Sequence, residues 1–379
     1  MVRHRGLSQR DDQHESASLL NTTSKRKNMD RKMFKKGSSR KRSIGLKILF
    51  SIAILLILVY LVVPFVFKLS SNFRNALLFM NYVNVQVFMD VTKPESEYGL
   101  NCTRVFYIQS NNSIQLGAWH VYPKPMKCDK SEGGEFDDGK SVVFYIHGNG
   151  GTRGGSHRVD LYKLLAYGEP DSHVVTFDYR GYGDSSPVSP TIPGVIDDAI
   201  HAYRWLLTKV NPKRITMWAH SLGTAVSLSM LRKIRDDELP TRLILEAPFS
   251  SVSDAVVNYP LTRIYKYYPF FDSCFVESLK DPIYDLLNSE ENIRFAKIPI
   301  TILHAEDDAI VPVFLGKKLF ESSKRNVFRQ SQDFKVGVEM KTYEGDLGYG
   351  HKHIHRDKGL SKMISNLVYK PPKQAPTSK

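Results

Sequence analysis

Blocks of apolar residues recur along residues 141–343, and each block is followed by a turn and then by a longer stretch of mixed polarity. The blocks are continuous runs rich in Val, Ile and aromatic residues, which is typical of strands buried on both faces of a sheet. We predict strands at Val142–Ile146, around Val174, at Ile215–Ala219, around Ile244, around Ile302 and at Val338–Tyr343.

The stretches between these strands have the period of an amphipathic helix. Between residues 194 and 210, apolar side chains recur every three or four positions, as one face of a helix requires. Strands that alternate with helices predict an α/β fold with a mainly parallel sheet that is covered on both faces. Ligands of such sheets bind at the carboxyl ends of the strands, so we expect a functional site at that edge.

An apolar run of a different kind precedes this region. Ile48–Phe67 holds twenty residues without a charge. At about 1.5 Å per residue, a helix of this length spans the ~30 Å hydrocarbon core of a bilayer. A buried core helix rarely lacks a polar face over so many turns. A cleaved signal peptide is disfavoured because 47 residues precede the run and no small-residue cleavage pattern follows it. We therefore predict a retained transmembrane signal anchor.

The positive charge of the chain is concentrated before this anchor. Residues 1–47 carry 14 Lys and Arg against four Asp and Glu, which is +10 of the formal +14. A basic cluster alone would fit nuclear import or nucleic-acid binding, but beside a transmembrane helix it places the N-terminus in the cytosol. We predict a largely disordered cytosolic tail at 1–47, a lumenal domain at 68–370 and a C-terminal tail at 371–379, with no nucleic-acid partner.

Glycosylation motifs and cysteines agree with a lumenal or extracellular domain. The sequons at Asn101 and Asn111 both fall after the anchor, so we predict that both asparagines are glycosylated. Cys102, Cys128 and Cys274 are too few for a disulfide framework, although an oxidising compartment would permit one bridge. The sequence does not choose the pair. The C-terminus carries no retrieval signal of the KDEL type.

A candidate nucleophile stands where the predicted strand Ile215–Ala219 gives way to a predicted helix. Ser221 occupies the turn, with Ala219 two positions before it and Gly223 two positions after it. A serine on such a corner exposes its hydroxyl above the sheet, and the corner needs small neighbours. The pattern A-x-S-x-G departs from the usual G-x-S-x-G by one methyl group. The motif alone therefore leaves an ordinary serine at a helix start as an alternative.

An acid that can serve this serine follows a later strand. A serine hydroxyl needs a base to take its proton and an acid to orient that base, and one common chain order is serine, acid, histidine. Glu306, Asp307 and Asp308 end the strand around Ile302. Asp308 fits the acid best, because it stands four residues before Pro312 in a D-x-x-V-P ending. We interpret Glu306 and Asp307 as solvated loop residues.

Three histidines follow the last predicted strand at alternate positions, namely His351, His353 and His355. Three ligands at this spacing could bind a metal ion on one face of a strand, but a glycine-rich loop precedes them and no H-E-x-x-H motif is present. We expect one histidine to act as the base, the others to lie on the surface, and no metal to be bound.

A glycine-rich stretch after the strand Val142–Ile146 is a candidate oxyanion hole. Negative charge that develops on a tetrahedral intermediate needs backbone amides directed at it. The amide of Asn149 or Gly150 can supply one donor and that of Leu222 the other. Glycine-rich loops also bind phosphates, but the stretch has neither G-x-G-x-x-G opening a helix nor G-K-[ST]. We expect no nucleotide cofactor.

Several of these stretches together resemble a known family. They read HGNGGTRGGSHR at 147–158, WAHSLGT at 218–224, LHAEDDAIVP at 303–312 and DLGYGHKHI at 346–354, behind one N-terminal span. The combination is similar to the membrane-anchored lysophosphatidylserine lipases, α/β-hydrolase domain-containing protein twelve and its close relatives. Ala219 is the visible departure, and it removes no catalytic group.

The resemblance implies an α/β-hydrolase fold with the nucleophile at Ser221, the acid at Asp308 and the base at His351. It implies a single-pass enzyme of the endoplasmic reticulum membrane with a lumenal active site. Such an enzyme hydrolyses acyl esters of lysophosphatidylserine and monoacylglycerols, and it needs no cofactor. A membrane serine peptidase of similar fold and a catalytically silent hydrolase-fold interaction protein are the alternatives that the residues leave open.

Residues 248–297 interrupt the rhythm of strands and helices and are rich in aromatic side chains. An insertion between two sheet strands is where this fold carries a cap, so we predict a cap that binds the acyl chain. Packing of the aromatic residues into a second small core is the alternative. Outside this segment, we interpret Asp178, Arg180 and Glu246 as residues that fix neighbouring loops by hydrogen bonds.

Overall fold

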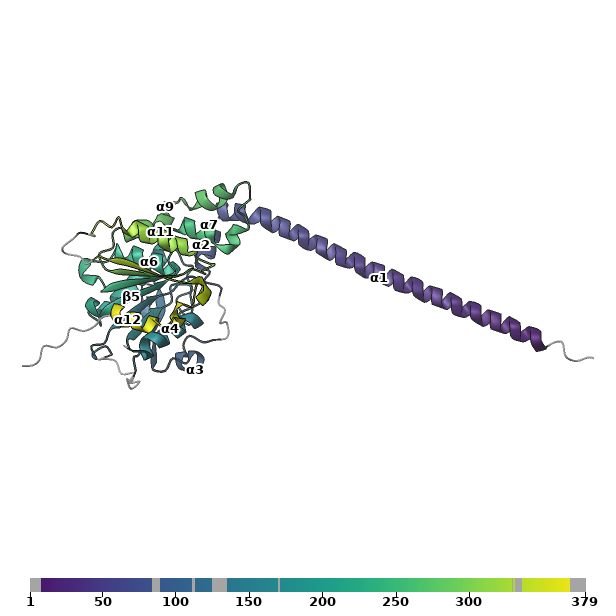
Figure 1. The fold of residues 1–379 in the computed structure, drawn as a ribbon, viewed down its shortest axis with the longest axis horizontal. Helices are drawn as coiled ribbons and strands as arrows, with labels where there is room; N and C mark the ends of the chain where they lie inside the picture. The colour runs from purple at the N-terminus through teal and green to yellow at the C-terminus, as the bar shows by residue number, and fades with distance from the viewer. Residues whose placement is uncertain are drawn as a thin grey trace, which may run out of the picture. The chain divides into compact units, whose positions relative to one another are not determined.

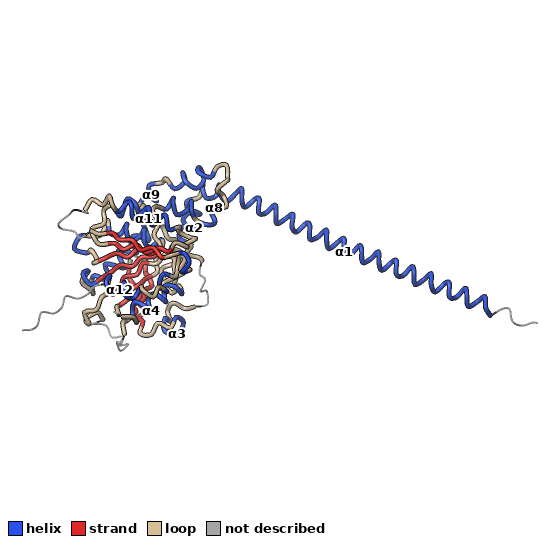
Figure 2. The backbone as a smooth tube through the Cα atoms, viewed as in Figure 1, coloured by secondary structure: helices blue, strands red, loops and turns tan. Residues whose placement is uncertain are grey.

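The computed structural model describes residues 8–83, 89–110, 113–124, 135–169, 171–328, 330 and 336–368. The chain forms two units, residues 1–63 and 64–379, and the second unit carries the sheet. Figure 1 follows the elements along the chain, and Figure 2 separates helices from strands by colour.

Helix α1 (Ser8–Leu69) begins in the first unit and ends in the second. Its segment Ser43–Leu69 is long and apolar enough to cross a membrane, and it contains the predicted anchor at 48–67. Residues 8–47 are also helical, whereas the composition of this tail predicts little regular structure. The difference has a physical reason, because this stretch holds many residues of high helix propensity, such as Lys, Arg, Leu and Gln, and no proline.

One eight-stranded sheet forms the centre of the second unit, in the order β1-β2-β4-β3-β5-β6-β7-β8. Strands β3 to β8 run parallel, and β1 and β2 join antiparallel at one edge. The strands are β1 (Thr103–Gln109), β2 (Gln115–Val121), β3 (Val142–Ile146), β4 (His173–Phe177), β5 (Ile215–His220), β6 (Arg242–Glu246), β7 (Ile300–Ala305) and β8 (Val338–Tyr343).

This sheet confirms the α/β-hydrolase fold predicted from the sequence. Every residue of β3, β4, β5 and β7 is buried, as their continuous apolar runs predict. Strands β1 and β2 were not predicted from the sequence. Strand β3 lies between β4 and β5. The chain passes from β3 to β4 on one side and then crosses to β5 on the other side, so the direction of winding reverses at β3 and the loops after β3 and β5 lie next to each other. Such a point is where α/β sheets bind ligands.

Helices cover the sheet on both faces (Figures 1 and 2). On one side α5 (Ile192–Leu207) contacts α6 (Leu222–Leu231), and α6 contacts α10 (Ser289–Ile293), which in turn contacts α11 (Val313–Ser323). On the other side α4 (Ser156–Tyr167) and α12 (Leu360–Leu367) both contact the short helix η6 (Ile354–Arg356). Two small helices, α2 (Ser71–Phe79) and α3 (Pro94–Tyr98), precede the sheet.

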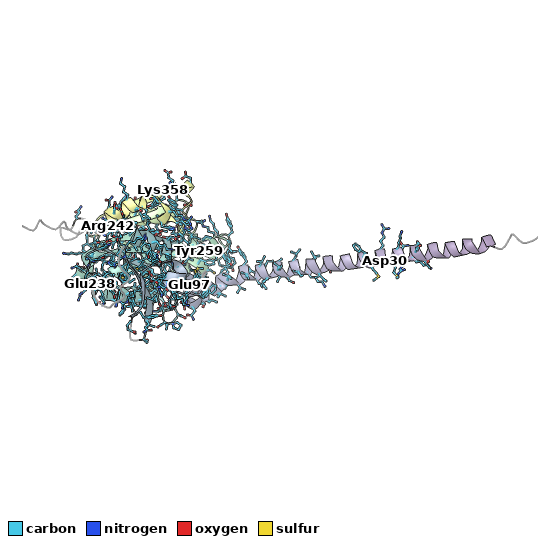
Figure 3. The ribbon with its side chains drawn as sticks, turned by 90° about the horizontal axis from the view of Figure 1, so that it is seen from below. Asp30, Glu97, Glu238, Arg242, Tyr259 and Lys358 are labelled. Carbon is cyan, nitrogen blue, oxygen red and sulfur yellow. The ribbon has the colours of Figure 1, made fainter. Side chains whose placement is uncertain are left out.

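Short helices fill the segment between β6 and β7, where the sequence predicts a cap. They are α7 (Val252–Asn258), α8 (Pro260–Arg263), η3 (Asp272–Val276), η4 (Glu277–Leu279), α9 (Pro282–Asp285) and α10. Tyr259, which is labelled in Figure 3, stands between α7 and α8. The aromatic residues divide into two sets, since Tyr265, Tyr268 and Phe275 are buried whereas Tyr267 is 88% exposed.

The structure describes one of the two predicted glycosylation sites and two of the three cysteines. Asn101 is exposed, whereas Asn111 lies outside the described residues. Cys102 is disulfide-bonded and Cys274 is a free, buried thiol. Cys128 also lies outside the described residues.

Candidate active site

Ser221 lies in a strained corner between β5 and α6. Its backbone has φ 51° and ψ −118°, a left-handed region that residues other than glycine seldom adopt. Hydrogen bonds hold this conformation on both sides. The Ser221 N–H donates to the carbonyl oxygen of Glu246 (2.9 Å), and the Ser221 carbonyl accepts from the amide of Thr224 (2.9 Å). The corner therefore presents the Ser221 hydroxyl at the carboxyl edge of the sheet.

The two small residues around this corner meet different constraints. A Cβ atom at Gly223 would lie 2.3 Å from the carbonyl oxygen of Ile146, which is a backbone atom that cannot move aside. Ala219, in contrast, is a fully buried strand residue that pairs with Ile146 in the register of β3 and β5. The methyl group by which the motif departs from G-x-S-x-G therefore fits the core, and the corner forms with it in place.

Three predicted site residues from separate loops come together at hydrogen-bond distances. His351 Nε2 lies 3.0 Å from Ser221 Oγ, and His351 Nδ1 lies 2.7 Å from Asp308 Oδ2. In the tautomer that this geometry requires, Nδ1–H donates to the carboxylate and Nε2 accepts from the serine hydroxyl. The arrangement can move a proton from the hydroxyl to the imidazole.

The surroundings of Asp308 keep its carboxylate ionised. Burial alone would raise the pKa of Asp308, but hydrogen bonds from His304 and His351 and the charge of these rings hold it well below the ordinary value. The other carboxylate oxygen, Oδ1, accepts from the amides of Ile310 (2.9 Å) and Val311 (2.8 Å). A proton that reaches His351 therefore stays on the imidazole.

Two side chains that sequence analysis did not select hold His351 in place. Asp307, which we interpreted as a solvated acid, accepts the amide of Gly350 with both carboxylate oxygens, each at 2.9 Å. Gly350 has φ 50°, so this contact fixes a left-handed turn directly before the histidine. His220 Nε2 lies 2.9 Å from the carbonyl oxygen of His351. Burial lowers the pKa of His220 well below its usual value, so its neutral ring can donate there.

The candidate oxyanion donors are two backbone amides. Among the described residues, neither the Asn149 N–H nor the Leu222 N–H has a hydrogen-bond acceptor. Gly150, the other donor considered, is excluded because its N–H donates to the carbonyl oxygen of Phe79 (3.0 Å). Leu222 is the first residue of α6, where helical amides lack internal partners. Gly148 passes close to Ser221, since a Cβ atom there would lie 3.0 Å from the Ser221 Cβ.

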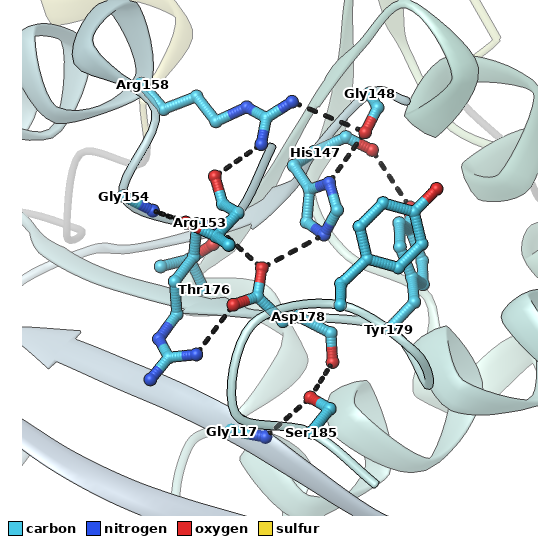
Figure 4. A network of polar contacts seen from close by, with 12 residues as sticks. Gly117, His147, Gly148, Arg153, Gly154, Arg158, Thr176, Asp178, Tyr179 and Ser185 are labelled. Carbon is cyan, nitrogen blue, oxygen red and sulfur yellow. Dashed lines mark hydrogen bonds and ion pairs between the residues drawn. The ribbon is translucent and has the colours of Figure 1, made fainter. Parts of the chain in front are cut away.

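A buried arginine fixes the carbonyl groups of the loop that carries Asn149. We call residues 147–151, which follow β3, the glycine loop. Arg158 Nη2 donates to the carbonyl oxygens of Gly150 (3.0 Å), Gly148 (3.4 Å) and Asn149 (3.4 Å). Figure 4 shows the contact of this guanidinium with Gly148. With the carbonyl groups held on one side, the amides of the loop point to the other.

The charged residues that follow β3 and β4 form ion pairs with one another and with α5. Arg153 Nη1 forms ion pairs with Asp178 (2.7 Å) and Asp184 (2.5 Å), as Figure 4 shows in part. Arg180 pairs with Asp198, with Nη2 at 2.7 Å from Oδ1. These contacts join neighbouring segments of the chain to one another.

Glu246 is a buried carboxyl group beside the nucleophile corner. Its side chain accepts from Trp218 Nε1 (2.8 Å), and its backbone oxygen holds the amide of Ser221. Burial raises the pKa of Glu246 to about 7, and the negative charge of Asp308 adds to the effect. Glu246 therefore takes up a proton near neutral pH.

The three histidines at alternate positions do not converge on one point. His351 faces Ser221, whereas His355 Nε2 lies 3.6 Å from Asp160 Oδ2. His353 packs its ring against that of His355, with centroids 5.7 Å apart. In the part of the chain that the structure describes, no group of three or more His, Cys, Asp or Glu side chains is placed to hold a metal ion.

Comparison with known proteins agrees with this fold and extends over most of the chain. The model of the α/β hydrolase fold family matches residues 141–273. Lysophosphatidylserine lipase ABHD12 of Danio rerio is 36% identical over 328 residues, which cover 84% of this chain and 83% of that protein. The protein of the same name from Gallus gallus is 37% identical over 318 residues, with 82% and 81% covered. The chain belongs to the ABHD12 family of α/β hydrolases.

This membership confirms the family predicted from the sequence. Protein ABHD12B of Homo sapiens is a further relative, 35% identical over 271 residues, with 69% of this chain and 72% of that protein covered. Among solved structures, an esterase of Pyrococcus furiosus matches with a TM-score of 0.52 at 16% identity, covering 76% of this chain and all of that one. An α/β hydrolase of Vibrio vulnificus has a TM-score of 0.51 at 16% identity, with 79% and 92% covered. At this identity the two structures show the shared fold alone.

Proposed function

We propose that this ABHD12-family protein is a serine hydrolase that cleaves acyl esters of lysophospholipids, lysophosphatidylserine first among them, and of monoacylglycerols. One observation carries the proposal, namely the unbroken chain of hydrogen bonds from Ser221 through His351 to Asp308, at 3.0 and 2.7 Å. The lysophosphatidylserine lipases that are 36 and 37% identical to the chain supply the substrate class.

The reaction begins with attack of Ser221 Oγ on the ester carbonyl carbon. As the Oγ–C bond forms, His351 Nε2 takes the hydroxyl proton, and the anionic Asp308 stabilises the resulting imidazolium. The carbonyl oxygen becomes an oxyanion, which accepts hydrogen bonds from the Asn149 and Leu222 amides. The carbon–oxygen bond to the glycerol then breaks, and the leaving oxygen takes its proton from His351.

Water completes the cycle on the acyl-enzyme. His351 accepts a proton from the attacking water, a second oxyanion forms between the same two amides, and the bond to Ser221 Oγ breaks. Oγ recovers its proton from the imidazolium, and a fatty acid leaves. All proton transfers use His351, so this mechanism requires neither a metal ion nor a cofactor.

Exposed apolar side chains support a membrane-bound substrate. On the segment between β6 and β7, Leu261, Ile264, Tyr267 and Phe270 are all more than half exposed. The ring of Phe65, near the end of α1, lies 6.4 Å from that of Phe270, so these side chains begin where the apolar helix ends. Aromatic residues are enriched where proteins meet the membrane interface.

The distribution of basic residues around the apolar segment supports the proposed topology. The apolar segment Ser43–Leu69 spans the bilayer once, with the basic residues before it in the cytosol and the hydrolase domain in the lumen, in the endoplasmic reticulum. Glycosylation at the exposed Asn101 would report this orientation, because the modification occurs only on the lumenal side. A glycosidase-sensitive mass shift that Asn101→Gln reduces is the expected result, and its absence at both sequons contradicts the topology.

Activity assays on the full chain test the proposal. Wild-type protein is expected to react with a fluorophosphonate probe and to release fatty acid from lysophosphatidylserine, and Ser221→Ala is expected to do neither. Peptide substrates assayed beside the lipids separate a lipase from a peptidase. Faster peptide hydrolysis would assign the protein to the peptidases, and a wild type that fails to label would identify a catalytically silent protein.

Comparison of lipids in cells that carry wild-type or Ser221→Ala protein gives the substrate preference. The proposal expects lysophosphatidylserine to accumulate with the inactive variant. If only a different lysolipid accumulated, the assignment as a hydrolase would stand, but the proposed head-group preference would be wrong.

A further inference from the structure

The two glycines that end the glycine loop, Gly150 and Gly151, donate their amides outside the loop. Gly150 and Gly151 both have positive φ, at 62° and 63°, and two successive residues in this region form an open turn that other amino acids seldom adopt. The amides of both glycines donate to a distant part of the chain and not to the loop itself. The position of the Asn149 amide therefore depends on the hydrogen bonds between the loop and other segments of the chain.

The segment that accepts these hydrogen bonds follows the apolar helix in the chain. We call residues 78–83, which end α2 and continue beyond it, the strap. Gly150 N–H donates to the carbonyl oxygen of Phe79 (3.0 Å), and Gly151 N–H donates to that of Val83 (2.8 Å). The side-chain amide of Asn149 donates to the carbonyl oxygen of Leu78 (3.3 Å). Three successive residues of the loop thus each donate to the strap.

The end of a helix explains why the strap can accept these bonds. The last carbonyl groups of a helix have no internal partner, and α2 ends at Phe79. Met80 then takes a left-handed conformation with φ 48°, which turns the chain sharply, and its own amide donates back to Ala76 (3.0 Å). The free carbonyl groups of Leu78 and Phe79 therefore face the loop.

The strap is itself fixed to the domain by buried contacts. The Phe79 side chain is fully buried, and the hydroxyl of Tyr182 donates to the Phe79 carbonyl oxygen (2.5 Å). Asn81 Nδ2 donates to the carbonyl oxygen of Gly181 (3.1 Å). The Phe79 oxygen thus accepts from Tyr182 and from Gly150 together, which uses both of its lone pairs.

The strap and Arg158 bind the glycine loop from opposite sides, and together they restrict the direction in which its remaining amide can point. Arg158 holds the carbonyl groups of residues 148 to 150 on one side, and the strap takes the amides of Gly150 and Gly151 on the other. Asn149, Gly150 and Gly151 all donate to the strap, but Asn149 does so through its side chain. Its backbone amide has no acceptor among the described residues. That amide belongs to the peptide next to Gly148, which lies against Ser221.

We propose that the strap is a positioning segment of the active site, which aims the Asn149 amide at the oxyanion. The proposal rests on the hydrolase function proposed above. The strap touches no substrate and acts through the glycine loop, so it contributes to the transition state and not to substrate binding. The chain that leaves the membrane anchor is by this account a part of the catalytic apparatus.

Two variants weaken the strap to different degrees in the full-length protein. Tyr182→Phe removes only the hydroxyl that donates to the Phe79 oxygen, and Phe79→Ala removes the buried ring that seats the segment. Leu77→Ala is the matched control, because Leu77 lies on the same helix and is partly exposed. Phe79→Leu, which keeps a large apolar side chain, is expected to restore much of what Phe79→Ala loses.

Kinetics on a short soluble ester measure the effect on chemistry. Loss of an oxyanion donor costs about 100-fold or more in kcat, so a misaligned donor in Phe79→Ala is expected to cost about 10-fold to 100-fold, with KM almost unchanged. The affinity for a trifluoromethyl ketone, which forms a tetrahedral oxyanion on serine, is expected to fall by the same factor as kcat/KM. Leu77→Ala is expected to keep the wild-type kcat.

Amide hydrogen exchange tests the strap without any substrate. The amides of Gly150 and Gly151 are expected to exchange slowly in the wild type and faster in Tyr182→Phe, whereas Leu77→Ala leaves them slow. Fast exchange in the wild type overturns the proposal, and so do a wild-type kcat and inhibitor affinity in both strap variants. A wild type that does not react with a fluorophosphonate would instead contradict the proposed function, while the exchange result still decides the strap.

Discussion

Hydrogen bonds around Asp308 decide where charge resides in the site. Hydrogen bonds from His304 and His351 and the charge of these rings hold its pKa low despite burial, and two backbone amides donate to its other oxygen. Glu246 lies nearby with a single charge-neutral donor, Trp218, and its pKa is raised to about 7. At neutral pH Asp308 is therefore ionised, whereas Glu246 is about half protonated, because Glu246 is buried without a positively charged partner.

Replacement of Asp308 by Asn is expected to lower kcat by about 10⁴-fold, because an amide cannot stabilise the imidazolium and favours the wrong tautomer of His351. KM is expected to change little. Steady-state kinetics on a short ester check this result. Asp307→Asn is the matched control, since it keeps an oxygen for the Gly350 amide, and we expect it to retain kcat within about tenfold. Equal losses in the two variants would contradict the assignment of Asp308.

Glu246→Gln is expected to change how stability depends on pH. The folded protein holds the Glu246 proton up to a pKa of about 7, above the ordinary 4.5. This group's contribution to stability is therefore full below pH 4.5 and is lost as pH rises through 7, by ~3 kcal/mol. Gln keeps an acceptor for Trp218 and has no such loss.

The measurement is thermal unfolding of both proteins at pH 5 and pH 8. The wild type is expected to lose more of its midpoint temperature than Glu246→Gln between the two pH values. An identical loss in both proteins would show that Glu246 titrates at its ordinary pKa.

At the scale of elements, the corner from β5 to α6 sets the position of Ser221, the proposed nucleophile. The corner requires glycine at only one of its two small positions, because the Cβ of residue 223 would collide with the backbone of Ile146. Residue 219 is a regular strand position with space for a methyl group. The motif A-x-S-x-G is therefore sufficient for this corner.

A pair of reciprocal substitutions tests this difference. Gly223→Ala is expected to displace the corner, with a loss of stability of about 1–3 kcal/mol and a large loss of kcat. Ala219→Gly is expected to keep the wild-type kcat and to lose about 0.5–1 kcal/mol, because glycine is unfavourable in a strand. Thermal unfolding and ester hydrolysis measured on both variants give the result. A damaging Ala219→Gly with a harmless Gly223→Ala would reverse the argument.

Elements that depend on local pattern were predictable from the sequence, and contacts between distant residues were not. The buried strands and the Ser221 corner follow from apolar runs and adjacent small residues. The contact of Asp307 with Gly350, and that of His220 with His351, join residues far apart in sequence through groups that carry no motif. Strands β1 and β2 are mixed in polarity, and the helix over residues 8–47 follows from residue propensity.

At the scale of the whole molecule, the apolar surface on the segment between β6 and β7 predicts contact with lipid. In the full-length variant Tyr267→Trp reconstituted into vesicles, lipids brominated on the acyl chain are expected to quench the fluorescence of the introduced tryptophan. Tyr107→Trp is the matched control, because Tyr107 is an exposed tyrosine on β1. Equal quenching at both positions, or none at Tyr267→Trp, would contradict contact at this surface.

The hydrogen bonds between residues 78–83 and the glycine loop also bear on how this family can evolve. A gene that loses its anchor-coding segment would ordinarily yield a soluble enzyme, because an N-terminal helix is seldom part of a catalytic fold. Here a deletion that runs past α2 would remove the carbonyl groups that Gly150 and Gly151 use. Soluble descendants are therefore expected to retain α2 or to replace it, so the first short helix after the span is inherited with the hydrolase and not with the anchor.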